Sequence, residues 1–143
     1  MRLSRLAEGL VVVALTLAAS STYAANLVVI VPEVRPGPGS IRVALYQRAD
    51  SFRHEGQAFH VLSVPATQKS TSVTFTGVPA GRYAIVAYQD TNDNKRLDLR
   101  FGMFPREPWG LSNDPKVMGP PSFEAAAFDV TEPLSRIEVR LHY

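Results

Sequence analysis

Four oxygen-bearing side chains recur at short intervals in the second half of the chain, and their spacing could hold a metal ion. They are Asp90, Asn92, Asn94 and Asp98. Carboxylate and amide oxygens at alternate positions can curl around one hard cation, and Ca²⁺ takes about six to eight oxygen ligands. The pattern therefore predicts a calcium-binding turn with these four residues as its metal ligands.

The same segment departs from a strong calcium loop in ways that predict weak binding. Its spacing resembles the first half of an EF-hand loop, but Lys95 stands where that loop has glycine and Phe101 where it has a bidentate glutamate. Lys95 and Arg96 also bring positive charge close to the ion. In the alternative, the segment is a metal-free turn, because Asp and Asn side chains also bond to their own backbone in tight turns. The residues alone leave both interpretations open.

A proline-stiffened aromatic stretch follows this segment. Phe101, Phe104 and Trp109 lie there among glycine, methionine and proline residues. Aromatic rings on a stiff loop bind apolar or sugar ligands with little loss of conformational entropy, so these three are the predicted ligand-binding residues. In the alternative, the rings fold back and cover one end of the domain, where a chain without disulfides needs apolar area.

Signals for catalysis are weak. The sequence has no Gly-x-Ser-x-Gly elbow and no phosphate-binding glycine loop. Its three histidines, His54, His60 and His142, form no metal-binding pair at close spacing, and the chain has no cysteine. We therefore expect a non-enzymatic protein without catalytic residues, and with no cofactor other than calcium. The alternative is a hydrolase whose catalytic group is assembled from distant residues.

The N-terminus predicts export. Two arginines among the first five residues precede an apolar run over 9–19, and small residues lead to a cleavage point after Ala24. The run is about half of the ~20 residues that a membrane span needs. We therefore expect a signal peptide over 1–24 and a mature domain over 25–143 in the periplasm or the medium, with no membrane span after cleavage.

The composition limits the partners of the chain. With 15 Lys and Arg against 13 Asp and Glu, the chain has little net charge, no basic stripe for nucleic acid and no polybasic tail for membranes. The expected partner is an unknown small ligand or an envelope protein, and the expected state is a monomer.

The elements that must position these residues are β-strands. Hydrophobic alternation predicts strands over 27–31, 41–46, 59–64, 73–78, 83–88 and 137–143. Both faces of 83–88 are apolar, which indicates a central strand. In the last strand, alternation places Ile137, Val139, Leu141 and Tyr143 inward. About seven short strands separated by turn signals predict an all-β fold, a single immunoglobulin-like β-sandwich.

One long irregular loop is expected within this sandwich, over residues 90–128. It contains the candidate metal and ligand residues, and loops of this length are usually functional or packed against the domain. A short helix is predicted over 122–128, with Ser122 as its N-cap.

Three stretches in order resemble the exported bacterial family called domain of unknown function 2141. They are YAIVAYQD (83–90), DTNDNKRLD (90–98), and PREPWGLSN (105–113) leading into GPPSFEAAAF (119–128). VPAGRYAI (78–85) also resembles the turn and strand of transthyretin-like and collagen-adhesin B-type sandwiches. The resemblance covers nearly the whole mature chain. It implies an exported, transthyretin-like single domain, and it implies no activity and no catalytic residues.

Overall fold

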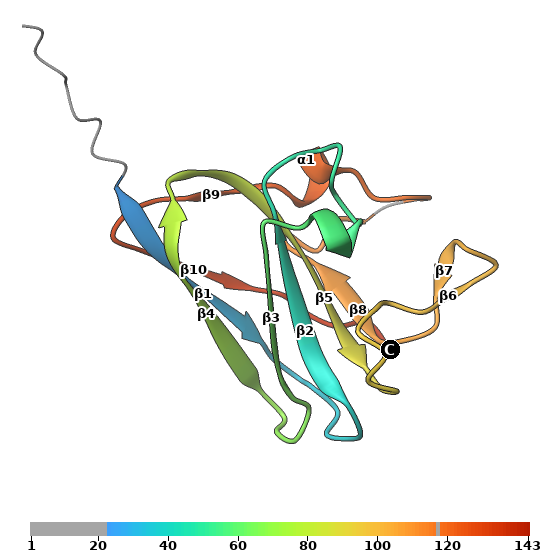
Figure 1. Ribbon diagram of the computed structural model, residues 1–143. Coiled ribbons are helices and arrows are strands. Elements are labelled where there is room, and N and C mark those ends of the chain that lie inside the picture. Colours follow the sequence, from blue (N-terminus) through green and yellow to red (C-terminus); the bar gives the residue numbers. More distant parts are fainter. Residues whose placement is uncertain (1–22, 117) are drawn as a thin grey trace, which may run out of the picture.

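Two β-sheets pack face to face in the computed structural model (Figure 1), which describes residues 23–116 and 118–143. The strands are β1 (Ala24–Val31), β2 (Ser40–Tyr46), β3 (His60–Pro65), β4 (Thr71–Pro79), β5 (Gly81–Asp90), β6 (Leu99–Arg100), β7 (Phe104–Pro105), β8 (Trp109–Leu111), β9 (Phe128–Val130) and β10 (Leu134–Glu138). The smaller sheet has the order β10-β1-β4 and the larger has the order β3-β2-β5-β8, with β9 also paired to β5. The predicted all-β sandwich is confirmed. The predicted signal peptide over 1–24 lies almost entirely outside the described residues.

Strand β5 is central and is buried on both faces, as its sequence predicts. Tyr83, Ile85 and Ala87 face the smaller sheet and join the main core cluster, while Ala84 and Val86 join a second cluster on the opposite face. Successive side chains of a strand point to opposite faces, so a strand that is apolar throughout must be covered on both sides.

Two loops cover the second face of the larger sheet. One runs from β2 to β3 and contains a 3₁₀ turn, η1 (Glu55–Gln57); the other carries the short helix α1 (Phe123–Ala126). Phe52 and Phe123 meet there edge to face, with ring centroids 5.9 Å apart. The Ser122 hydroxyl accepts a hydrogen bond from the N–H of Ala125 at 3.2 Å. The predicted N-cap is therefore confirmed, although the helix ends earlier than predicted because β9 begins at Phe128.

The C-terminal strand differs from its prediction. β10 runs parallel to β1 and ends at Glu138, after which the chain crosses to the larger sheet and His142 pairs with Trp109. Val139 and Leu141 are buried as predicted, but Tyr143 is 48% exposed, so its predicted inward orientation is wrong. Once the chain leaves a sheet, period-2 alternation no longer tells which side is covered.

The segment 90–128 also contains more regular structure than predicted. β6 and β7 form a hairpin, and β8 joins the larger sheet, where Trp109 lies opposite Tyr88. Strands of two or three residues are too short to show a period in the sequence. None of the helices in the described part of the chain is long and apolar enough to cross a membrane.

Candidate binding site at the Asp90 turn and the β6–β7 hairpin

The candidate site begins where β5 leaves the larger sheet. β5 ends at Asp90, and residues 90–98, which we call the Asp90 turn, lead directly into the β6–β7 hairpin (residues 99–105). Figure 1 shows this hairpin extending away from the two sheets. The central strand therefore places both sequence-predicted groups at one edge of the sandwich.

Asp90 organises the turn through its carboxylate. The side chain is fully buried, and its two oxygens accept hydrogen bonds from the backbone N–H groups of Asn94 at 3.1 Å and Lys95 at 2.7 Å. Asp93 and Lys95 both have positive φ, 55° and 62°, a conformation that costs free energy for residues other than glycine. Bonds to a buried carboxylate help to hold the backbone in this conformation.

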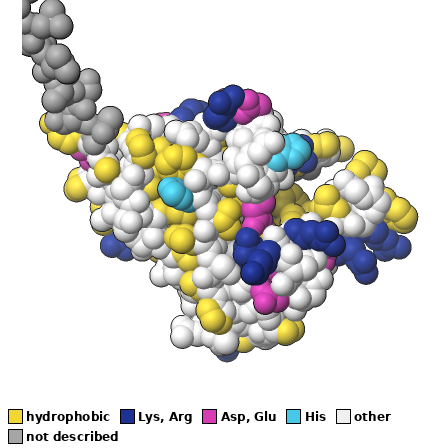
Figure 2. All heavy atoms as spheres, viewed as in Figure 1, with side chains coloured by type: hydrophobic (Ala, Val, Ile, Leu, Met, Phe, Trp, Pro, Cys, Tyr) yellow, Lys and Arg dark blue, Asp and Glu magenta, His cyan; other side chains and the backbone are white. Residues whose placement is uncertain are grey.

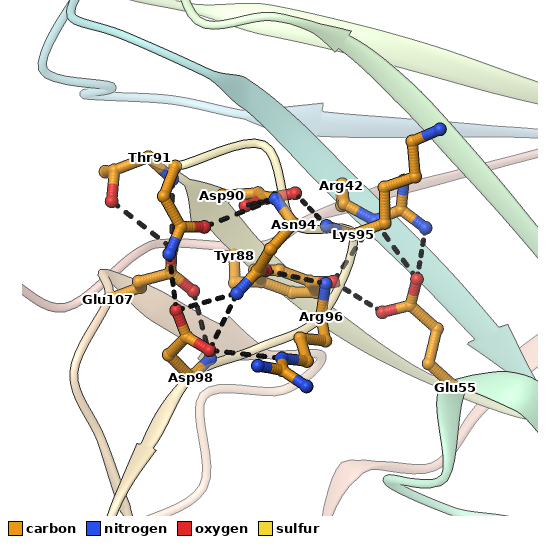
Figure 3. Close-up of polar contacts among 11 residues, drawn as sticks. Arg42, Glu55, Tyr88, Asp90, Thr91, Asn94, Lys95, Arg96, Asp98 and Glu107 are labelled. Carbon is orange, nitrogen blue, oxygen red and sulfur yellow. Dashed lines mark hydrogen bonds and ion pairs between the residues drawn. The ribbon is translucent and has the colours of Figure 1, made fainter.

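The exposed Asn92 and Asn94 both bond to the half-buried Asp98; Figure 3 shows Asn94 and Asp98 facing each other across the turn. The Nδ2 of Asn92 donates to Asp98 at 2.7 Å, and the Nδ2 of Asn94 donates to both Asp98 oxygens at 2.8 and 2.9 Å. The Oδ1 atoms of the same amides accept backbone N–H groups of Asn94 and Arg96. Because a backbone N–H can only donate, these bonds set which way each amide points.

The same contacts affect the ionisation of Asp98. Hydrogen bonds from Asn94 and Asn92, together with the charge of Arg96 at 3.4 Å, hold the pKa of the Asp98 carboxyl below its usual value. The carboxylate form is therefore favoured by donors that belong to the turn itself.

This arrangement does not fit a calcium ion without rearrangement. Both Asp90 oxygens accept backbone N–H groups, and both amides turn nitrogen rather than oxygen toward Asp98. Among the residues that the structure describes, no group of three or more His, Cys, Asp or Glu side chains is placed to hold a metal ion. The four predicted ligands do lie together, but as a hydrogen-bonded turn, and calcium binding stays a prediction.

Glu107 clips the two ends of the turn together, a role that sequence reasoning missed. Glu107 as a whole is 6% exposed, and its carboxylate accepts the N–H of Thr91 at 3.0 Å, the Thr91 hydroxyl at 3.2 Å and the N–H of Asp98 at 3.0 Å. The N–H of Arg106 also donates to the carbonyl of Asp98 at 2.8 Å. A single glutamate between an arginine and a proline gives no sign of burial in the sequence.

A second group of hydrogen-bonded polar side chains, also drawn in Figure 3, joins β2, β5 and the η1 segment. Arg42 on β2 donates from Nε to Glu55 at 3.0 Å and to the Tyr88 hydroxyl at 3.1 Å, and Tyr88 donates to Glu55 at 2.6 Å. Burial raises the pKa of Tyr88 well above its usual value, and the hydrogen bond to Glu55 raises it further. The three side chains satisfy one another and hold the η1 segment against the sheet.

The hairpin places its large apolar side chains in solvent. Phe101, Met103 and Phe104 are 78, 68 and 59% exposed, and Leu99 at its base is 45% exposed. Two of the predicted ligand-binding residues, Phe101 and Phe104, therefore do not fold back over the end of the sandwich. The bond from the Met103 N–H to the Arg100 carbonyl, 3.2 Å long, closes the tip.

The family comparison covers both the sandwich and this site. Residues 29–138 match a sequence family described as an uncharacterized protein conserved in bacteria, domain of unknown function 2141. The chain belongs to this family. The match runs from β1 to the end of β10 and includes the Asp90 turn and the hairpin, which confirms the resemblance found in the sequence. No match to a curated protein or to a solved structure was found.

In this member of family 2141, the three predicted ligand-binding residues are divided between two places. Phe101 and Phe104 line a shallow, open concavity of about 510 Å³ together with Arg100, Pro105 and Arg106. Trp109 lies instead on β8, where it is partly buried and packs against the second core cluster. The concavity is therefore a basic and aromatic notch that does not include the tryptophan.

The family 2141 chain also places one histidine beside a carboxylate. The Nε2 of His142 lies 2.6 Å from an oxygen of Asp114, and the two side chains are 61 and 53% exposed. Neither residue lines the notch beside Phe101 and Phe104, and neither lines a second concavity, which lies beside Asp93. The pair supplies the histidine–carboxylate contact that a hydrolase would use, but both side chains are more than half exposed.

Proposed function

We propose that this protein is an exported, non-enzymatic binding module whose recognition surface is the β6–β7 hairpin. The observation that carries the proposal is the exposure of Phe101, Met103 and Phe104 on one protruding element. Exposed apolar side chains that gather in one place mark interaction sites. Glu107 and Asp90 hold the base of the element, and a pre-organised surface loses less entropy on binding.

The conformation of Phe101 supports the same proposal. Its φ is 54°, in the left-handed region that costs a bulky residue about 1–2 kcal/mol. Its ring is 78% exposed, so packing within the fold does not offset this cost. An aromatic side chain that adds strain without burial contributes little to folding, which favours a role in binding.

Export and the absence of catalysis are parts of this proposal that rest on separate observations. The basic and then apolar pattern of residues 1–24 supports secretion. Both side chains of the His142–Asp114 contact are more than half exposed, so water is not excluded from them as it is from most catalytic sites. N-terminal sequencing of protein from fractionated cells tests export, with cleavage after Ala24 as the expected result.

Site-specific photocrosslinking tests the recognition surface. A photoreactive phenylalanine analogue is placed at Phe101, and at Arg136 on β10 as an exposed control far from the hairpin in the sequence. Irradiation in cells that export the protein should give adducts from position 101 and none from position 136. Equal labelling from both positions, or neither a protein nor a lipid adduct from either, would contradict the hairpin as the recognition surface.

A further inference from the structure

Two exposed arginines, Arg100 and Arg106, flank the exposed apolar residues of the hairpin, and this combination indicates the chemistry of its partner. We propose that the hairpin docks on the surface of an anionic phospholipid bilayer, with its apolar side chains at the level of the headgroups and its arginines on lipid phosphates. This inference rests on the proposed function, because it uses the same surface, and it adds the identity of the partner.

Arginines flank the exposed apolar residues of the hairpin: Arg100 lies in β6 and Arg106 directly follows β7, and both are exposed. Three acidic residues at its base are engaged elsewhere, because Asp90 and Glu107 are buried and accept backbone N–H groups and Asp98 lies 3.4 Å from Arg96. Figure 2 shows Lys and Arg side chains beside the hydrophobic ones at this projection. An anionic surface therefore complements this end of the molecule.

The notch places charged and apolar groups side by side. Arg100 and Arg106 line it beside Phe101 and Phe104, and the Arg100 guanidinium lies 5.2 Å from the centre of the Phe101 ring. A guanidinium binds phosphate through parallel N–H groups, while a ring next to it prefers the boundary between water and acyl chains. An anionic lipid presents both groups in the same order.

The shape of the hairpin favours a bilayer over a small molecule or an acidic protein. Phe101 and Met103 keep most of their surface in water, and the notch that Phe101 lines is shallow and open, so a small molecule bound in it would leave much of both side chains exposed. An acidic protein could neutralise the arginines, but it would need a pocket of its own for the tip. A bilayer surrounds a protruding apolar tip without any such pocket.

Vesicle co-sedimentation of the purified protein tests the inference. Phosphatidylcholine vesicles in which a third of the lipid is phosphatidylglycerol should bind the protein, and pure phosphatidylcholine vesicles should bind it far less. Replacing both arginines of the notch (Arg100→Gln with Arg106→Gln) should weaken binding about fivefold per charge. Added salt should weaken it further, because it screens the remaining charges.

Replacing an apolar residue at the tip of the hairpin separates effects on binding from effects on folding. Phe101→Asn should weaken binding about tenfold through lost apolar contact. It should leave the melting temperature unchanged or slightly raised, because Asn tolerates positive φ. The matched controls are Leu134→Ser and Arg136→Gln on β10, an exposed apolar and an exposed basic residue, and both should bind as the unmodified protein does.

A tryptophan reporter locates the contact. Phe101→Trp in a Trp109→Phe background leaves one tryptophan, at the tip, because the chain has a single tryptophan. Its emission should shift to the blue with anionic vesicles.

The outcomes distinguish this inference from the function on which it rests. Vesicle binding that the hairpin variants do not weaken overturns the lipid inference. Absence of vesicle binding together with protein adducts from position 101 also overturns it, but leaves the hairpin as a recognition surface for a protein. No vesicle binding and no adducts from position 101 overturns both.

Discussion

The buried carboxylate of Glu107 holds Asp98 in place: its Oε2 accepts the backbone N–H of Asp98 at 3.0 Å, nine residues earlier in the chain. The other oxygen accepts the N–H of Thr91 at 3.0 Å, at the opposite end of the Asp90 turn. One side chain thus closes the loop from which the hairpin projects. The hairpin is exposed, but its base is anchored to the sandwich by part-buried hydrogen bonds to the buried Glu107.

Removal of Glu107 should destabilise the domain. Glu107→Ala leaves the N–H groups of Thr91 and Asp98 without their acceptor, and losing two such part-buried, charge-assisted hydrogen bonds costs about 1–2 kcal/mol each. We expect the free energy of unfolding, measured in urea, to fall by about 2–4 kcal/mol. The control is Glu124→Ala, which removes an exposed ion pair with Arg82 and should cost less than about 1 kcal/mol. Equal losses of unfolding free energy in the two variants would show that Glu107 does not hold the two ends of the turn together.

A methyl group on Gly110 should separate β8 from the C-terminal tail. A Cβ there would lie 1.8 Å from the carbonyl oxygen of Arg140, a backbone atom that cannot rotate away. Gly110→Ala should therefore weaken the two backbone bonds between Trp109 and His142 and cost about 2–4 kcal/mol of unfolding free energy. Gly56→Ala, with no atom within 4 Å of its Cβ, is the matched control. Its unfolding free energy should stay close to that of the unmodified protein. A Gly110→Ala protein as stable as this control would contradict the packing of the tail.

The domain should lose stability at alkaline pH through its buried tyrosines. Burial raises the pKa of Tyr46, Tyr83 and Tyr88. The folded chain therefore keeps their phenolic protons where the unfolded chain has lost them. Their contribution is fully present below about pH 10, the ordinary pKa of tyrosine, and declines as the pH rises above it. Urea unfolding across this range should show the decline.

Two further measurements check this pH dependence. Absorbance of phenolate in the folded protein should show these three tyrosines resisting ionisation until the protein unfolds. Tyr88→Phe should make the alkaline decline shallower, although it also removes the bonds to Glu55 and Arg42. Ionisation of Tyr46, Tyr83 and Tyr88 near the ordinary value in folded protein would rule out the proposed cause.

Calcium should leave the melting temperature unchanged. A ligand of the folded state stabilises it by RT ln(1 + [L]/Kd), and the Asp90 turn already uses its oxygens to accept N–H groups. We expect no shift between chelator and about 10 mM calcium at matched ionic strength. A rise with calcium that Asp98→Asn abolishes would instead support the metal site predicted from the sequence.

Local patterns in the sequence were enough to predict much of this fold. β5 was expected to be central because both of its faces are apolar, and Ser122 was expected to cap a helix because of its position before an apolar run; both are confirmed. The Asp and Asn spacing also located the turn after β5. These features depend on residues close together in the chain, so periodicity and side-chain chemistry are sufficient to indicate them.

Only the tertiary structure decided which side chains of the long segment are covered. Phe101 and Phe123 are both aromatic residues within 90–128, yet one is 78% and the other 7% exposed. The difference arises because α1 lies over the second face of the larger sheet, while the hairpin extends beyond its edge. Likewise, Glu107 became the clip of the turn, and Tyr143 stayed exposed, through contacts with distant residues. Burial is set by what packs against a residue, and the residue's neighbours in the sequence carry little information about that.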